Sequence, residues 1–251
     1  MSPARCLFFT ACVFIMSCSH THSSWQRAGQ AAHDAALHPS VWAPLAGAAV
    51  FAVDDLDDRT VNHLSDHTPL FGDQDSAKDA SDDLKSALMI SAGVSAFMAP
   101  APAGDNYLVH SAEHLAVAMA GVGVAGGLTD VIKDASDRQR PNGENDKSFP
   151  SGHASQSFAA ATLASANVHR AWGDSHAARW ADAGLYTAAS LTAYARVEAE
   201  KHHPSDVLVG ASLGNFVARF LDQLLLEDES AVSLTGFVND KSLVVGIQYG
   251  F

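Results

Sequence analysis

Lys133 and Arg140 stand seven residues apart, and Pro141 directly follows Arg140. On a helix this spacing places both cations on one face two turns apart, and the proline ends the helix just after Arg140. Both side chains could then point at one anion. Taken alone, the cluster could also be a solvated helix end, where basic side chains are favoured by the helix dipole.

A second cluster runs from Pro150 to Ser155 and forms a turn that leads into an apolar segment. Ser151 can donate a hydroxyl hydrogen bond, and Gly152 lets the backbone approach a ligand closely. The free N–H groups at a helix start favour an oxyanion. His153 is placed to give or take a proton. The same residues would also suit a plain N-cap turn.

A third cluster holds Arg196, His202 and Asp206. Pro204 can open a new helix, which leaves His202 just before it and Asp206 in its first turn. That position is close enough for a carboxylate to hold and polarise an imidazole ring. Arg196 adds a third cation. As an isolated histidine and aspartate, the pair would be ordinary surface chemistry.

Together the three clusters resemble the signature of the type 2 phosphatidic acid phosphatase superfamily. This superfamily includes lipid phosphatases, bacterial acid phosphatases and vanadium haloperoxidases. The order and internal spacing agree from Lys133 to Asp206. Two features depart from the pattern: Ala195 stands where the family usually has serine, and the segment Asn142 to Phe149 between the first two clusters is short. The first would remove a phosphate hydrogen bond, and the second shortens a loop that helps to shape substrate choice.

The resemblance implies a metal-independent phosphatase without a cofactor, acting on phosphate monoesters or on lipid phosphates and diphosphates. It assigns phosphate binding to Lys133, Arg140, Ser151, Gly152 and Arg196. Fixed charges around the phosphoryl oxygens are the main source of acceleration in such reactions. His202 would attack phosphorus, Asp206 would orient it, and His153 would protonate the leaving oxygen. Spacing from Arg196 and from Asp206 selects His202 rather than His203 as the nucleophile.

The N-terminus has the features of an export signal. Arg5 precedes an apolar run, Cys6 to Met16, which is too short to span a bilayer. Ile15 to Cys18 resembles the lipobox of bacterial lipoproteins, in which the cysteine is acylated. We therefore expect a signal peptide at residues 1–17 and a lipidated polar tether at residues 18–40, anchored at the outer membrane and facing the periplasm. An ordinary cleaved signal with an incidental cysteine is the alternative.

Ala-rich apolar segments predict an all-α fold, a helical bundle of about six main helices within a domain at residues 41–228. The predicted helices cover Val41 to Val53, Leu84 to Met98, Tyr107 to Val131, Ala154 to Trp172, Ala177 to Glu200 and Val207 to Leu226. Charges and prolines interrupt most of the apolar segments, which favours a soluble bundle over membrane spans. Near-alternating apolar residues predict a small capping β-hairpin within residues 229–251.

The formal net charge of -13 gives no reason to expect nucleic-acid binding, so an anionic substrate needs a local basic site. Hydrophobic residues make up 47% of the chain and charged residues 17%, values typical of a globular protein with one core. The acidic stretches Asp54 to Asp58 and Asp73 to Asp83 are expected to be solvated loops and helix starts.

Three other functions are compatible with parts of the sequence. His110, Glu113 and His114 fit the inverted pattern of zinc proteases, with two histidines one helical turn apart and a glutamate as base. The phosphatase-like pocket could instead hold vanadate and act as a haloperoxidase. A non-catalytic envelope lipoprotein is the third possibility. Inhibition by chelators would separate the zinc protease from a phosphatase.

Overall fold

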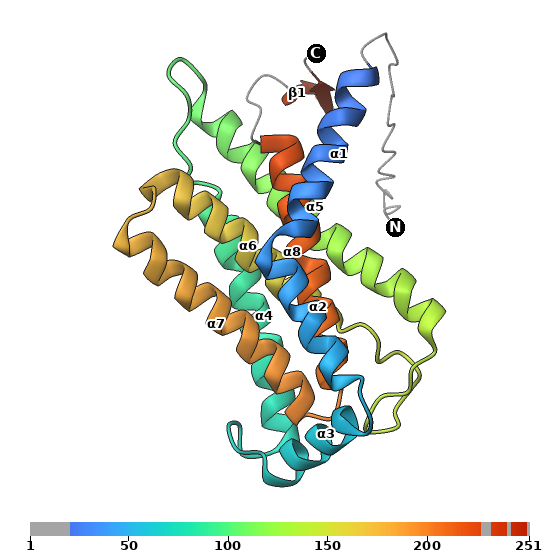
Figure 1. Ribbon diagram of the computed structural model, residues 1–251. Coiled ribbons are helices and arrows are strands. Elements are labelled where there is room, and N and C mark those ends of the chain that lie inside the picture. The colour runs from blue at the N-terminus through green and yellow to red at the C-terminus, as the bar shows by residue number, and fades with distance from the viewer. Residues whose placement is uncertain (1–20, 227–231, 240–241, 250–251) are drawn as a thin grey trace, which may run out of the picture.

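The computed structural model describes residues 21–226, 232–239 and 242–249, with side chains from residue 25 to residue 226 (Figure 1). Cys18 and the predicted signal peptide lie outside these residues. The described helices are α1 (Thr21–Leu37), α2 (Pro39–Phe51), α3 (Leu56–His67), α4 (Gln74–Ser95), α5 (Tyr107–Ser136), α6 (Gly152–Trp172), α7 (His176–Glu198) and α8 (Pro204–Leu226). The predicted all-α class is confirmed for the body of the molecule. The predicted count of six helices is wrong, because the described residues form eight.

Helix α1 occupies much of the segment predicted to be a polar tether, so that prediction is wrong for the described part of residues 18–40. Ala31 and Ala35, one helical turn apart, are buried, and α1 packs against α8. The side chain of Asn215 on α8 donates a hydrogen bond to the Ser40 carbonyl at 2.9 Å. Small alanines form the apolar stripe here, and the surrounding glutamines and histidines hide it in a hydropathy pattern.

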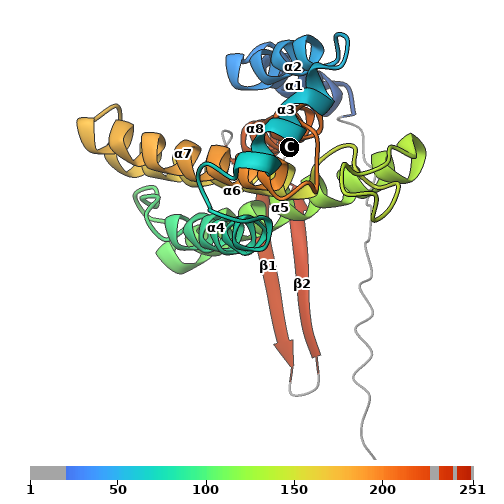
Figure 2. The same cartoon turned by 90° about the horizontal axis from the view of Figure 1, so that it is seen from below.

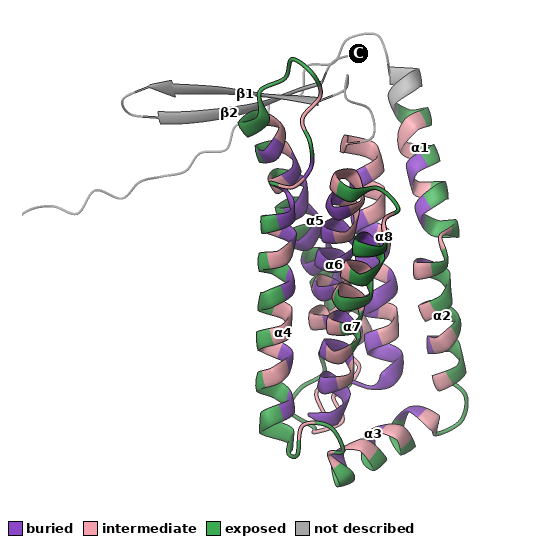
Figure 3. Cartoon of the chain, turned by 90° about the vertical axis from the view of Figure 1, so that its left-hand side faces the viewer, coloured by how far each residue is buried: buried purple, intermediate pink, exposed green. Residues whose placement is uncertain are grey.

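Helix α6 lies at the centre of the bundle and packs against α4, α5, α7 and α8. In Figure 3 the buried residues gather on the inward faces of α5, α6 and α8, while exposed residues follow the outer face of α4. Helix α5 lies at the side of the core, because its large hydrophobic residues Met119 and Val131 are exposed.

Two glycines of α8 close the contact between α6 and α8. A Cβ atom added at Gly210 would lie 2.5 Å from the carbonyl oxygen of Ser151, and one at Gly214 would overlap the carbonyl oxygen of Ser155. The two backbones therefore touch without intervening side chains. This contact holds the start of α6 against the first turns of α8.

One helix in the described part of the chain, α5, is long and apolar enough to cross a membrane by length and composition. The buried core helix of a soluble protein passes the same test, and 39% of its most apolar 18-residue window is buried here.

The strands β1 (Val232–Asn239) and β2 (Ser242–Tyr249) pair antiparallel, with Val232 opposite Tyr249 and Asn239 opposite Ser242. They lie within the segment for which the sequence predicts a hairpin. Figure 2 shows the two strands extending away from the helices rather than across them.

Candidate functional site

The three sequence clusters meet at one end of the bundle, where α7 ends and α8 begins close to α3 (Figure 1). The N–H of Ser151, the N-cap of α6, donates to the carbonyl oxygen of Asp206 on α8 at 3.0 Å. Lys133 in the last turn of α5 reaches the first residue of α6, and its Nζ would lie 3.4 Å from a Cβ added at Gly152. The eight predicted site residues that this end brings together are Lys133, Arg140, Ser151, Gly152, His153, Arg196, His202 and Asp206.

His202 is 1% exposed, and its Nδ1 lies 2.6 Å from the carbonyl oxygen of Ser148. Because a carbonyl oxygen can only accept, Nδ1 must carry the proton. Burial, aided by the charges of Arg196 and Lys133, lowers the pKa of His202 to about 4 in spite of the nearby Asp206. The ring is therefore neutral at pH 7, and its Nε2 has a free lone pair.

Asp206 was predicted to orient His202 directly, and the geometry corrects this. Its Oδ2 lies 3.9 Å from Nδ1 of His202, which is too long for a hydrogen bond. Oδ2 instead accepts from the Ser148 hydroxyl at 2.6 Å and from the His203 N–H at 2.8 Å. Asp206 thus acts on His202 through Ser148, whose hydroxyl it binds and whose carbonyl holds the ring.

Arg138 is a site residue that the sequence reasoning missed. Its Nη1 donates to Oδ1 of Asp206 at 2.6 Å, and its Nη2 donates to Oδ2 of Asp57 at 2.8 Å. Burial alone would raise the pKa of Asp206, but the donors around it and the Arg138 charge hold the pKa well below its usual range. Arg138 lies between Lys133 and Arg140 in the first cluster, which is the signal that could have found it.

Asp57 belongs to an acidic stretch that was predicted to be solvated, and for this residue the prediction is wrong. It is 7% exposed. Its Oδ1 accepts from the N–H of Ser205 at 2.9 Å, and its Oδ2 accepts from Arg138. Arg138 and Ser205 are distant from Asp57 in the sequence, so the residues around Asp57 do not predict these two contacts.

The end of α5 also differs from the prediction. The helix stops at Ser136, and Asp137 takes a left-handed conformation with φ 46°. Lys133 and Arg140 therefore do not share a helix face. Arg140 is brought to the site by a loop in which its N–H donates to the carbonyl of Asn145 at 2.9 Å.

The cations of the site lie close enough to repel one another. Burial, with the charges of Arg140 and Arg196, lowers the pKa of Lys133. Burial, with the charge of Arg140, lowers the pKa of Arg196 to about 10. The Nε atoms of both arginines are buried and have no hydrogen-bond partner in the described part of the protein. An anion placed among these cations would relieve the repulsion and satisfy the unpaired donors.

His153, the second histidine of the site, is partly exposed and paired with a carboxylate. Its Nε2 lies 2.6 Å from Oδ1 of Asp82 on α4, and the Lys85 Nζ lies 3.3 Å from the same nitrogen. Burial and the charges of Arg196 and Lys85 lower the pKa of His153 to about 4, while Asp82 acts in the opposite direction. Asp82 also comes from a stretch predicted to be solvated, and its side chain is indeed 46% exposed, but its contact with His153 was not predicted.

The zinc-protease pattern lies on the first half of α5, away from this cluster. His114 is buried, and its Nδ1 is 2.6 Å from Oδ1 of Asn167, while the rings of His110 and His114 are 4.5 Å apart. Across residues with described placement, no group of three or more His, Cys, Asp or Glu side chains is arranged to hold a metal ion. His114 is accounted for by a contact in the core.

Comparison with known proteins points to one superfamily. Residues 114–227 match the model of the PAP2 superfamily. The chain is similar to a lipid A 1-phosphatase of Porphyromonas gingivalis, with 34% identity over 111 residues that make up 43% of this chain. The match covers 24% of that protein, so the chain spans about a quarter of its length. No solved structure matches the chain significantly. The segment that matches this model, residues 114–227, contains every predicted site residue from Lys133 to Asp206.

Proposed function

We propose that this protein is a phosphoric monoester hydrolase that cleaves phosphate monoesters, lipid phosphates among them, through a phosphohistidine on His202. The observation that carries the proposal is a buried, neutral imidazole whose Nδ1 is held by the Ser148 carbonyl. Its other nitrogen is free for attack, the charges of Arg196 and Lys133 act on the ring, and Arg140 lies close enough to both cations to repel them. Such an arrangement suits nucleophilic attack on a phosphoryl group.

In the first step, Lys133, Arg140 and Arg196 bind the phosphoryl oxygens, and Nε2 of His202 attacks phosphorus. The P–N bond forms as the bond from phosphorus to the leaving oxygen breaks, and that oxygen takes a proton from His153. The imidazole becomes positively charged when phosphorylated, and the Ser148 carbonyl stabilises it because Nδ1 keeps its proton throughout. The product alcohol then leaves.

His153 must carry a second proton for this step, although its pKa is about 4 in the free site. A bound phosphate dianion offsets the charges of Arg196 and Lys85 that lower this pKa. Asp82 raises it further through its hydrogen bond. Substrate binding therefore raises the pKa of His153 and draws a proton onto the ring.

In the second step, water attacks phosphorus and transfers a proton to the now neutral His153. The P–N bond breaks, inorganic phosphate leaves, and Nε2 of His202 regains its lone pair. The step needs only protein side chains and water, so we propose that the reaction is metal-independent. Lipid phosphates are the favoured substrate class, because the similar Porphyromonas gingivalis protein is a lipid A 1-phosphatase.

A panel assay of the purified protein tests the function. We expect phosphate release from nitrophenyl phosphate and from lipid phosphates, unchanged by a chelator and blocked by vanadate as a phosphate analogue. Loss of activity in chelator with recovery in zinc would contradict the metal-independent mechanism. Halide oxidation by the vanadate-loaded protein in peroxide, without phosphatase activity, would favour the haloperoxidase instead.

We also propose that Cys18 carries a lipid that anchors the protein at the outer membrane facing the periplasm. The lipobox-like residues Ile15 to Cys18 support the anchor. Three residue steps separate Cys18 from Thr21, where α1 begins, and an extended chain covers about 10 Å in that distance. The lipid would thus hold the helical domain close to the membrane. Cys18→Ser should release the protein from membranes, and retention after a high-salt wash would contradict the anchor.

A further inference from the structure

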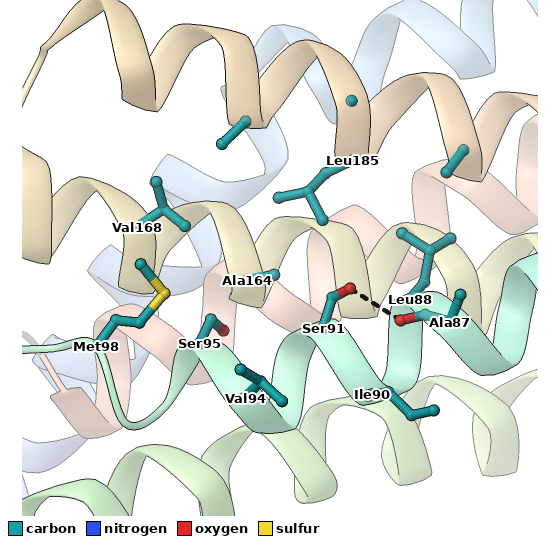
Figure 4. A pocket seen from close by; sticks show the side chains of 13 residues that line it. Ala87, Leu88, Ile90, Ser91, Val94, Ser95, Met98, Ala164, Val168 and Leu185 are labelled. Carbon is teal, nitrogen blue, oxygen red and sulfur yellow. Dashed lines mark hydrogen bonds between the residues drawn. The ribbon is translucent and has the colours of Figure 1, made fainter.

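A groove with a volume of about 520 Å³ runs between α4, α6 and α7 (Figure 4). Its lining is apolar and includes Leu88, Val94, Met98, Val168, Leu185 and Ala188. The hydroxyls of its two serines are already paired. Ser91 donates to the carbonyl of Ala87 at 2.8 Å, and Ser95 donates to the carbonyl of Ala92 at 3.0 Å. A polar ligand would find few partners here, whereas an apolar one would displace water at no loss of hydrogen bonds.

Large apolar side chains of the groove face solvent. Ile90 is 66% exposed and Val94 is 60% exposed, and both belong to the lining. Exposed apolar side chains gathered along a concave surface mark a site for an apolar ligand.

The groove is carried by the helices that build the phosphate cluster. On α4, Lys85 contacts His153, and the groove begins two residues later at Ala87. On α7, Ala188 lines the groove, and Arg196 follows about two turns later. A ligand with an anionic head and an apolar tail would therefore place its head at the cations and its tail in the groove.

The length of the groove also fits such a tail. From Lys85 to Ser95, where α4 ends, the helix advances about 15 Å at about 1.5 Å per residue. An extended alkyl chain advances about 1.3 Å per carbon, because its bonds zigzag, so about a dozen carbons would lie along this distance.

We propose that the groove between α4, α6 and α7 binds the alkyl chain of a phosphorylated lipid whose phosphate lies at Lys133, Arg140 and Arg196. The inference rests on the proposed phosphatase function and names the part of the protein that selects lipid over small substrates. Transfer of each methylene from water into the groove favours the bound state, so chain length should control the specificity constant.

The first experiment measures phosphate release from n-alkyl phosphates, from butyl to dodecyl, each below its micelle-forming concentration, with nitrophenyl phosphate as the chainless reference. We expect kcat/KM to rise by up to about fourfold per methylene and to level off when the groove is filled. Hydrolysis of nitrophenyl phosphate without any dependence on chain length would overturn the groove and leave the phosphatase standing. Absence of hydrolysis of every phosphate ester would instead overturn the proposed function.

A matched pair of variants locates the effect. Gly184→Leu fills the groove, and Gly29→Leu makes the same change on α1, outside it. Both glycines are exposed within helices, and an added Cβ at either meets nothing within 4 Å, so neither change should disturb the fold. We expect Gly184→Leu to lower kcat/KM for dodecyl phosphate at least tenfold while leaving nitrophenyl phosphate unchanged, and Gly29→Leu to leave both unchanged.

Two outcomes would count against the lipid chain. An equal loss with both substrates in Gly184→Leu would mean that the change acts on the catalytic site instead. A change of oligomeric state in Gly184→Leu with an unaltered chain-length profile would mean that the groove is an interface between copies of the protein.

Discussion

The two histidines of the site occupy opposite kinds of surroundings. His202 is held by a backbone carbonyl, and behind it Ser148, Asp206, Arg138 and Asp57 form a continuous chain of hydrogen bonds. His153 contacts side chains alone, the half-exposed Asp82 and the lysine beside it.

These surroundings fix the proton on His202 and allow His153 to exchange one. A backbone carbonyl cannot take up a proton, so the tautomer of His202 is constant and its nucleophilic nitrogen stays available. The pair of His153 and Asp82 is partly exposed, and the nearby cations make its proton affinity sensitive to any bound anion. We infer that His202 and the hydrogen-bonded chain behind it form a rigid region for bond formation. His153, Asp82 and the lysine beside them form a responsive region for proton transfer.

Loss of the rigid histidine should have the largest effect. We expect His202→Ala to lower kcat by several orders of magnitude for every substrate, because no other group supplies the nucleophile. His203→Ala is the control, and it should lose far less, since both ring nitrogens of His203 lie against carboxylates, those of Asp206 and Asp58. Acid quenching should trap phosphate on the wild type and on His203→Ala. Phosphate trapped on His202→Ala would reverse the two roles.

Loss of the responsive histidine should cost less and should depend on the substrate. We expect His153→Ala to lower kcat by roughly a hundredfold to ten-thousandfold for an alkyl phosphate. With nitrophenyl phosphate the loss should be much smaller, because nitrophenolate leaves without protonation. Equal losses with the two substrates would show that His153 is not the proton donor to the leaving oxygen.

The rigid region should depend on Arg138 for its stability. Arg138→Met leaves Asp206 and Asp57 without their cation, and we expect a loss of about 3 kcal/mol in the free energy of unfolding, or less because Arg138 is one-third exposed. The lowered pKa of Asp206 contributes stability above about pH 4, which is lost as the pH falls. The difference from the wild type should therefore shrink below about pH 4 in denaturant titrations. A difference that does not vary with pH would point to lost packing instead.

The smallest effect is expected from the carboxylate of the responsive region. Asp82→Asn removes the group that raises the pKa of His153, so the ring loses its proton at lower pH. Activity that needs the protonated ring should then decline at lower pH than in the wild type, seen as an acid shift of the alkaline limb of kcat. An unshifted limb would separate Asp82 from proton transfer.

Sequence reasoning found the residues of this site that lie close together in the chain. The spacing from Arg196 through His202 to Asp206 falls within one helix end and the next helix start, where local geometry decides the positions. The partners Asp57 and Asp82 come from α3 and α4, and only the packing of those helices brings them to the site. The acidic neighbours of Asp57 are exposed, so composition predicted a solvated side chain for this buried residue as well.

For the fold as well, features marked by the local sequence pattern were predicted and the others were missed. Segments with an apolar pattern were predicted as helices, whereas α1 and α3 were missed because few large apolar residues mark them. The end of α5 was misplaced because a left-handed aspartate stops the helix before Pro141. In each case the deciding interaction lies outside the local sequence pattern or in backbone geometry that composition does not reveal.

The contact between α6 and α8 has a consequence for how this site can vary. Gly210 and Gly214 place one backbone directly on another, so no side chain there can be trimmed or repacked to absorb a change. The start of α6 carries His153, and His202 stands two residues before the first residue of α8, so widening this contact would separate nucleophile from acid. Substitutions in the outer helices and in the groove can therefore change the substrate range. The two glycines, in contrast, keep the distance between His202 and His153 nearly constant.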